Sequence, residues 1–181
     1  MTPAPFAVRD AKPTDASTLA AIRIRSWRAA YTGLVPAQIL ERMSLERNMA
    51  FFAARVETPD GHETLTIEDE TRTPRGYALT GPCADADGKG LGEVQAIYLD
   101  PDARGQGLGD VLLADAIARL GNAGFIEAVL WVLTANSPAR RCYERHGFVL
   151  DGAARMLDFD GTPIEEIRYR RTVPAPTTIR A

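Results

Sequence analysis

A glycine-rich segment between a predicted strand and a predicted helix constrains this chain more than any other stretch of its sequence. The segment reads RGQGLG over Arg104–Gly109; it follows the strand-like run Glu93–Leu99 and opens an amphipathic helix expected over Leu108–Leu120. The first N–H groups of a helix have no intrahelical partner, and the helix dipole makes that end positive. Glycines let an anion approach the backbone closely. Strand, glycine turn and helix start in this order therefore predict a site for a phosphorylated ligand.

Length, composition and charge narrow the classes of protein that this chain can be. Its 181 residues suffice for one domain with a substantial core, and 45% hydrophobic with 25% charged residues is ordinary for a globular protein. The net charge of −3 gives no general attraction to nucleic acid or to an anionic membrane surface, so we expect neither as a partner. No apolar run approaches the roughly 20 residues of a membrane span.

The cysteines, the histidines and the first residues bear on compartment and metal binding. Cys83 and Cys142 have no metal-ligand spacing and lie in different contexts, so we expect neither a disulfide nor a metal site. We interpret His62 and His146 as structural. The segment Met1–Phe6 has neither the basic region nor the apolar core of a secretory signal. These features predict a reducing compartment, with the cytoplasm as the expected location.

The hydrophobic pattern is helical in the first third of the chain and strand-like from about residue 64. Helices are expected from Pro13 to about Ala30, from Pro36 onward, over Leu45–Val56, and from an N-cap at Ser137 with Pro138 after it to Gly147. Strands are expected over Phe6–Arg9, Thr64–Ile67, Gly76–Thr80, Glu93–Leu99, Phe125–Leu133, Phe148–Asp151 with an extension over Arg155–Phe159, and Ile164–Thr172. This order predicts one α+β domain over residues 1–172 with a mixed, mostly antiparallel sheet, and a disordered tail over residues 173–181.

Two familiar phosphate-binding motifs do not fit the glycine-rich segment. A P-loop needs Lys and then Ser or Thr after its last glycine, whereas Asp110 and Val111 follow Gly109 here. A dinucleotide-binding turn has the spacing GxGxxG near the start of a repeating βαβ pattern. The spacing here is GxGxG, and at least three predicted strands precede it. Both motifs are therefore rejected.

The segment instead resembles the acetyl-CoA signature of the GCN5-related N-acetyltransferase (GNAT) superfamily. That signature is Gln/Arg-x-x-Gly-x-Gly/Ala, and Arg104–Gly109 matches it at every fixed position. Asn136, with Tyr143 seven residues later and the run Glu144–Phe148 after it, resembles the second cofactor motif of the family. The resemblance extends to roughly residues 6–172 through three further segments: Ser26–Pro36, Ala96–Leu99 before Asp100-Pro101, and Glu166–Tyr169. Several matches in the right order make the signal specific.

This resemblance implies a three-layer α/β/α fold whose mixed, mostly antiparallel sheet of about six to seven strands has a splayed central pair. It also implies acetyl-CoA as the cosubstrate, with the diphosphate on the glycine turn and the pantetheine paired as a pseudo-strand with a free strand edge. The residues it assigns to the cofactor are Ile97, Tyr98, Leu99, Arg104, Gly105, Gln106, Gly107, Leu108, Gly109, Asp110, Asn136 and Tyr143. Relatives often carry Arg or Lys where Asp110 stands. Because a carboxylate repels phosphate, we expect Asp110 to contribute its backbone N–H.

The resemblance further implies direct transfer of the acetyl group to an amine. The N–H of Leu99 would stabilise the oxyanion of the thioester, and Tyr143 stands at the position of the usual general acid. A free alkylamine has a pKa of about 10.4, so a base or a water chain must collect a proton. Counting alternate residues along the strand puts Glu93 on the same face as Leu99, which makes Glu93 the candidate base through one or two waters. Trp131 stands where some relatives carry a base, so the alternative to Glu93 is no protein base at all.

The acceptor side is the least defined by the sequence. Trp27 and Tyr31 lie one helical turn apart, and we expect them to form a wall of the acceptor pocket. A small-molecule amine and a peptide or protein amine both fit, and a homodimer is compatible with the family. Two alternatives stay open. One is a non-catalytic acyl-CoA-binding regulatory module, and the other is a transferase of longer acyl groups with a larger pocket around Leu133 and Tyr143.

Overall fold

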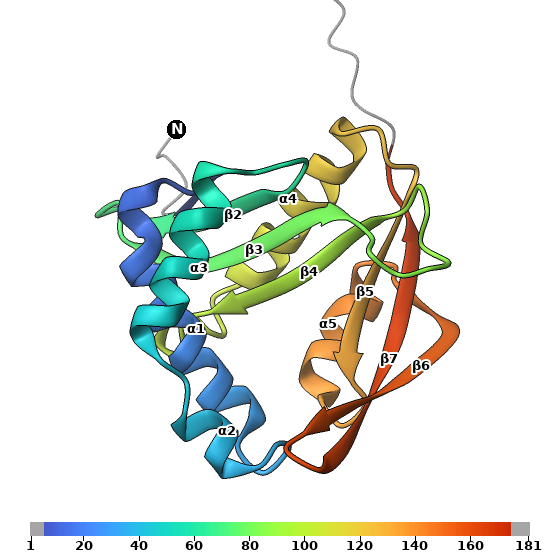
Figure 1. Ribbon diagram of the computed structural model, residues 1–181. Helices are drawn as coiled ribbons and strands as arrows, with labels where there is room; N and C mark the ends of the chain where they lie inside the picture. The colour runs from blue at the N-terminus through green and yellow to red at the C-terminus, as the bar shows by residue number, and fades with distance from the viewer. Residues whose placement is uncertain (1–5, 175–181) are drawn as a thin grey trace, which may run out of the picture.

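The computed structural model describes residues 6–174, which form a seven-stranded sheet between two layers of helices (Figure 1). The strands are β1 (Phe6–Asp10), β2 (Glu63–Asp69), β3 (Pro74–Pro82), β4 (Gly92–Leu99), β5 (Glu127–Leu133), β6 (Val149–Phe159) and β7 (Thr162–Thr172). Their spatial order is β1-β2-β3-β4-β5-β7-β6. Every neighbouring pair is antiparallel except β4 and β5, which are parallel. The expected mixed, mostly antiparallel sheet is confirmed.

The helices divide between the two faces of the sheet, as the three-layer expectation requires. They are α1 (Ala16–Tyr31), α2 (Ala37–Glu41), α3 (Leu45–Glu57), α4 (Leu108–Asn122) and α5 (Ser137–Arg145). Apolar residues of α1 and α3, such as Leu19 and Phe52, pack with Tyr77 of β3 on one face. On the other face, α4 packs against β2 and β3, and α4 and α5 pack against β5. The site described below lies between these two layers.

The central strands β4 and β5 separate soon after they meet. Only two residue pairs join them in the described structure, Gly92 with Ala128 and Glu93 with Val129. Figure 1 shows the two strands close at one end and diverging toward the other. The α4 residues Leu113, Ile117 and Leu120 pack against both strands and hold the halves of the sheet together. The expected splayed central pair is therefore confirmed.

A β-bulge in β4 overturns one expectation about the site. Leu79 of β3 pairs with Ala96 and the next residue pairs with Val94, so Gln95 has no partner in the register. An extra residue of this kind shifts the alternation of side chains beyond it. Val94 and Ile97 consequently both pack toward α4. The prediction that Glu93 shares a face with Leu99 was wrong: Glu93 points to the α1 face, and Leu99 packs with α4.

Most element boundaries differ by a few residues from those expected, and three of the differences change how a segment is interpreted. The N-cap of α5 is Asn136 rather than Ser137, because the Asn136 side chain accepts a hydrogen bond from the N–H of Ala139 at 3.3 Å. Strand β6 is one element that includes the expected extension, although its register with β7 shifts between Leu150 and Ala154. Val173 is buried in the core, so the folded domain reaches beyond residue 172; the rest of the predicted tail, residues 175–181, lies outside the described residues. No helix within residues 6–174 is long and apolar enough to cross a membrane.

Candidate active site

The separation of β4 and β5 coincides with a cleft of about 790 Å³. Residues of α1, β4, the glycine turn, β5, α5 and β6 line it. Every site residue expected from the sequence borders this cleft except Gln106, whose exposed side chain donates to the carbonyl of Asp102 at 3.4 Å. The fold thus brings together residues that are more than a hundred positions apart in the chain, such as Trp27 and Tyr143.

The glycine turn presents free backbone donors at one end of the cleft. Gly105 and Gly107 have φ of 76° and 77°, a left-handed conformation that costs glycine little and strains other residues. Gly107 is the N-cap of α4 and has no side chain to satisfy the first turn. Within residues 6–174, the N–H groups of residues 105–109 donate to no other backbone group outside regular helix and strand bonding. A turn of this kind is an anion site.

Asp110 departs from its expected role in that anion site. Its N–H already donates to the carbonyl of Gly107 at 3.1 Å, so it is not free for a phosphate oxygen as we expected. Its carboxylate turns toward α5, where it meets His146 at 2.9 Å and Arg145 at 3.2 Å. The hydrogen bond with His146 lowers the pKa of Asp110, and Arg145 adds to the effect.

The backbone of β4 supplies a second set of free groups. Asp100 donates its N–H to the carbonyl of Arg75 at 2.8 Å. In an antiparallel pair of strands, residues whose backbone groups bond to the partner strand alternate with residues whose backbone groups point away from it. Tyr98, two positions from Asp100, therefore directs its main chain at β3. Ile97 and Leu99 direct theirs into the space that β5 has left. This register favours Ile97 and Leu99, but not Tyr98, as backbone partners of an extended ligand.

Tyr143 reaches the cleft from α5, on the opposite side from β4. Its ring packs edge-on against Phe148 with centroids 6.2 Å apart. Burial raises the pKa of Tyr143, and the nearby hydroxyl of Tyr31 adds to the rise. The hydroxyl is therefore protonated at neutral pH. Asn136, at the start of the same helix, uses its side-chain oxygen for the cap and keeps its amide N–H groups for other partners.

An aromatic cluster forms the wall of the cleft on the α1 face. Trp27 and Tyr31 pack edge-on with centroids 5.0 Å apart, and the hydroxyls of Tyr31 and Tyr98 share a hydrogen bond of 2.8 Å. Tyr98, grouped with the cofactor residues by the sequence, has its side chain here instead. The Nε1 of Trp27 is buried and has no hydrogen-bond partner within the described chain. A donor of this kind favours a polar ligand beside it.

Glu93 lies at the narrow end of the cleft, where β4 and β5 still pair. Burial raises the pKa of Glu93, and the negative charge of Asp85 raises it further. Within residues 6–174 Glu93 makes no ion pair, whereas nearby Glu166 is paired with Arg155 at 3.0 Å. An unpaired, half-buried carboxylate with a raised pKa is suited to accept a proton.

Sequence reasoning missed the ion-pair network beside Glu93. Arg168, which is nearly buried, binds Asp85 at 2.9 Å and Asp87 at 2.6 Å from the loop before β4, and Asp151 at 2.8 Å. Asp85 also accepts from the indole of Trp131 at 2.9 Å. The network joins the loop that contains Asp85 and Asp87 to Arg168 and to Trp131, which lines the cleft. The sequence had singled out Trp131 and the segment Glu166–Tyr169, which contains Arg168, but it gave no sign that Asp85 and Asp87 are their partners.

Comparison with known proteins now decides the family. The sequence model of the Acetyltransferase (GNAT) family matches residues 23–148, which contain the glycine turn, β4 and α5. The chain belongs to the GNAT acetyltransferase family. It is therefore an acyltransferase, and the family resemblance found in the sequence is confirmed.

Relatives and solved structures extend the match over most of this GNAT chain. The protein named "Probable N-acetyltransferase Rv2775" from Mycobacterium tuberculosis is 25% identical over 177 residues, covering 97% of this chain and 99% of that protein. The structure of yncA from Salmonella typhimurium, solved with acetyl-CoA, has a TM-score of 0.72 at 20% identity and covers 98% of this chain and 99% of its own. The PaiA N-acetyltransferase of Thermoplasma acidophilum, solved with coenzyme A, has a TM-score of 0.69 at 21% identity and covers 92% and 98%. At these identities the structures support the fold.

The Arg168 network yields a prediction about the rim of the cleft. Replacing Arg168 with Met should destabilise the protein by about 3–5 kcal/mol, because it leaves partly buried carboxylates without their cation. Residues 83–90 should also exchange their amide hydrogens faster. Arg170→Met is the matched control on the same strand: its pair with Glu127 is more exposed, and its loss should cost below about 1 kcal/mol. Chemical denaturation measures the loss of stability, and hydrogen exchange measures the loss of amide protection. Equal losses of stability in the two variants would contradict a special role of Arg168 in holding this loop.

Proposed function

We propose that this protein is an acetyl-CoA-dependent N-acetyltransferase that moves an acetyl group to a primary amine by direct attack in a ternary complex. The observation that carries the proposal is that one cleft joins free N–H groups at the start of α4, a free backbone edge on β4 and the hydroxyl of Tyr143. Beyond its adenosine 3′-phosphate, acetyl-CoA carries a diphosphate, a peptide-like arm and a thioester in that order.

The donor arrangement follows from this geometry. The diphosphate sits on the N–H groups of residues 105–109, with the positive end of the α4 dipole beneath it. The pantetheine arm pairs with the main chain of Ile97 and Leu99, in the place of the strand partner that β5 does not provide. The thioester then lies beside the N–H of Leu99. Tyr143 faces it from α5.

The chemistry uses three groups in sequence. Glu93, through water, accepts the proton of the incoming ammonium, and the free amine attacks the thioester carbonyl. The N–H of Leu99 stabilises the oxyanion, a contribution of about 2.7–4 kcal/mol for one donor placed in this way. The tetrahedral intermediate breaks its carbon–sulfur bond, and the hydroxyl of Tyr143 gives its proton to the departing thiolate. The nitrogen that attacked still carries one extra proton, and its loss gives the neutral amide and restores the Tyr143 hydroxyl. The bulge at Gln95 turns the side chain of Glu93 toward the α1 face, where the acceptor binds, while the thioester lies at the backbone edge beside Leu99.

A direct test of this function is binding and turnover with purified protein. Calorimetry should detect one CoA or acetyl-CoA per chain, and a panel of primary amines should release free thiol with at least one member. If neither CoA nor acetyl-CoA binds, the proposal is wrong. Binding without turnover across a broad panel would favour a non-catalytic acyl-CoA module instead, and a preference for longer acyl donors would identify a different acyltransferase.

Tyr143→Phe tests the general acid. The change removes only the hydroxyl, so kcat should fall by about 100-fold or more while the KM for acetyl-CoA changes little. Tyr77→Phe is the matched control, because Tyr77 is a buried core tyrosine whose hydroxyl has no partner within the described residues. Its kcat should equal that of the wild type. Unchanged turnover in Tyr143→Phe would remove Tyr143 from the mechanism.

The pH dependence of the rate tests Glu93. Because burial raises the pKa of Glu93, the wild-type kcat/KM should rise with pH through a value above that of an ordinary glutamate. Glu93→Gln should lose about 100-fold in activity at neutral pH, and the loss should shrink as the pH approaches the amine pKa of about 10.4, where the substrate deprotonates unaided. Glu127→Gln, a carboxylate outside the cleft, is the control. A variant whose deficit is the same at every pH would contradict the role of Glu93 as base.

A further inference from the structure

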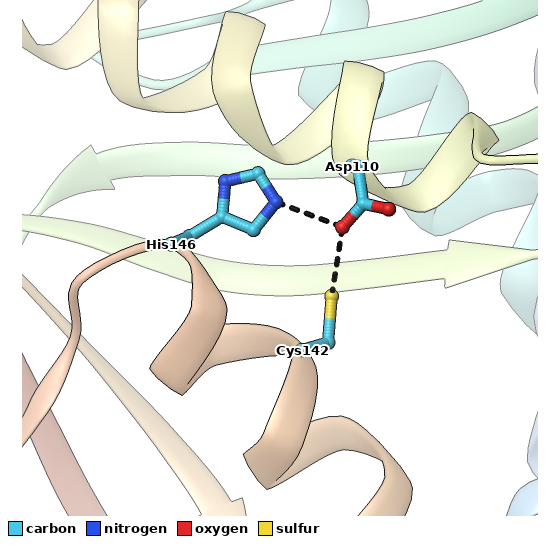
Figure 2. Close-up of side chains that lie close together, drawn as sticks. All are labelled: Asp110, Cys142 and His146. Carbon is cyan, nitrogen blue, oxygen red and sulfur yellow. Dashed lines mark hydrogen bonds and ion pairs between the residues drawn. The ribbon is translucent and has the colours of Figure 1, made fainter.

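Three side chains with metal-binding chemistry converge where α4 begins and α5 ends (Figure 2). The carboxylate Oδ1 of Asp110 lies 2.9 Å from Nε2 of His146 and 3.7 Å from Sγ of Cys142. All three candidate ligand atoms lie within 4.8 Å of one another. Cys142 and His146 are four residues apart, so one turn of α5 brings both to the same side, facing Asp110.

The spacing of these atoms suits a tetrahedral metal ion. With zinc–oxygen and zinc–nitrogen distances of about 2.0–2.1 Å and a zinc–sulfur distance of about 2.3 Å, tetrahedral geometry puts the carboxylate oxygen about 3.3 Å from the imidazole nitrogen and about 3.5 Å from the sulfur. The observed separations of 2.9 and 3.7 Å differ from those values by amounts that small side-chain rotations can absorb. Thiolate, imidazole and carboxylate are all ligands that zinc accepts.

We propose that Asp110, Cys142 and His146 bind one Zn²⁺, with a water molecule as the fourth ligand. Neutral His146 supplies the lone pair of Nε2 and Asp110 supplies Oδ1. The thiol of Cys142 gives up its proton to solvent and binds as the thiolate. The proposal revises the expectation that the chain has no metal site, because the i, i+4 spacing of Cys142 and His146 gains its third ligand only through the fold.

The surroundings of the cluster allow an ion to enter and to stay. Asp110 and Cys142 border the cleft, and the side chain of Asp110 is 48% exposed, which gives an ion a path from solvent. Arg145 lies 3.2 Å from Oδ1 of Asp110 in the metal-free arrangement. The carboxylate has a second oxygen, so Arg145 can keep a partner after Oδ1 binds the metal. Without the metal, the same atoms form a hydrogen-bonded link between α4 and α5.

A bound zinc ion changes the charge next to the diphosphate site, a consequence that rests on the proposed function. Asp110 is in the first turn of α4, where its negative charge opposes a diphosphate. With Zn²⁺, the charges of the metal, the carboxylate and the thiolate sum to zero. We therefore expect zinc to tighten binding of a CoA thioether by about 5-fold or more, and the thioether to tighten zinc binding equally.

Cobalt spectroscopy on tag-free protein tests the metal site. Under anaerobic conditions, Co²⁺ should bind at one ion per chain and produce a thiolate-to-cobalt charge-transfer band with the intense visible bands of a tetrahedral site. Zn²⁺ should displace it. Cys142→Ser should lose the charge-transfer band, and His146→Gln and Asp110→Asn should each weaken binding by about 100-fold or more.

The chain supplies its own matched controls, since it has two cysteines and two histidines and the site uses one of each. Cys83→Ser and His62→Gln should bind cobalt as the wild type does. A charge-transfer band that survives Cys142→Ser, or that Cys83→Ser removes, would overturn the proposal, as would the absence of saturable binding. X-ray absorption of the zinc-loaded wild type needs no variant and should show one sulfur among four ligands; a site with only nitrogen and oxygen ligands would refute it.

A calorimetric titration separates the metal site from the proposed function. A CoA thioether is the probe, because its sulfur carries no free thiol to chelate zinc. If zinc tightens binding of the thioether to the wild type but not to Cys142→Ser, the coupling is supported. If the wild type binds the thioether equally well with and without zinc, the coupling is overturned. Protein that binds cobalt through Cys142 but no CoA species would refute the acetyltransferase proposal and leave the metal site standing.

Discussion

The structure depends on the early separation of β4 from β5. Two adjacent parallel strands would normally pair along their length, yet only two residue pairs join these strands, and the remaining backbone groups face a cleft. A buried backbone donor left without a partner costs about 1–3 kcal/mol, so such an edge calls for water or a ligand. Packing at both ends of the cleft stabilises this divergence. Residues of α4 pack across both strands at the narrow end. At the wide end, an apolar cluster joins Leu133, the last residue of β5, to Val35 and Leu40.

The bulge at Gln95 determines which face of β4 each side chain on either side of it occupies. Before it, Glu93 points to the aromatic α1 side; after it, Leu99 packs toward α4. Had the alternation continued, the side chains of Glu93 and Leu99 would have shared one face. The strand therefore directs the Glu93 carboxylate toward the aromatic wall, while the backbone edge of Ile97 and Leu99 belongs to neither face. Gln95, the extra residue, is held by Arg55 of α3 and by His62.

The residues that the sequence assigns to the donor side border one cleft, except Gln106, and they could be found because their determinants are local. Left-handed glycines, a helix start and a seven-residue spacing from Asn136 to Tyr143 can all be read along the chain. The acceptor side depends on contacts that no local pattern records. The bulge follows from the register between β3 and β4, which alternate counting along one strand cannot detect. The ion pairs of Arg168 with Asp85 and Asp87 join residues about eighty positions apart. The side chain of Tyr98 packs in the aromatic wall, although the sequence had grouped Tyr98 with the cofactor residues.

Asp110 shows how local sequence patterns and tertiary contacts each give part of a residue's role. From sequence alone it is an unfavourable charge at a diphosphate site, and its backbone N–H seemed the only useful group. In the fold that N–H is already used, while the side chain meets His146, Arg145 and Cys142 of α5. The carboxylate thus links the helix that opens the donor site to the helix that carries Tyr143. Under the proposed function, a change in the charge around Asp110 would therefore act both on the binding of the diphosphate and on the contacts that hold α5.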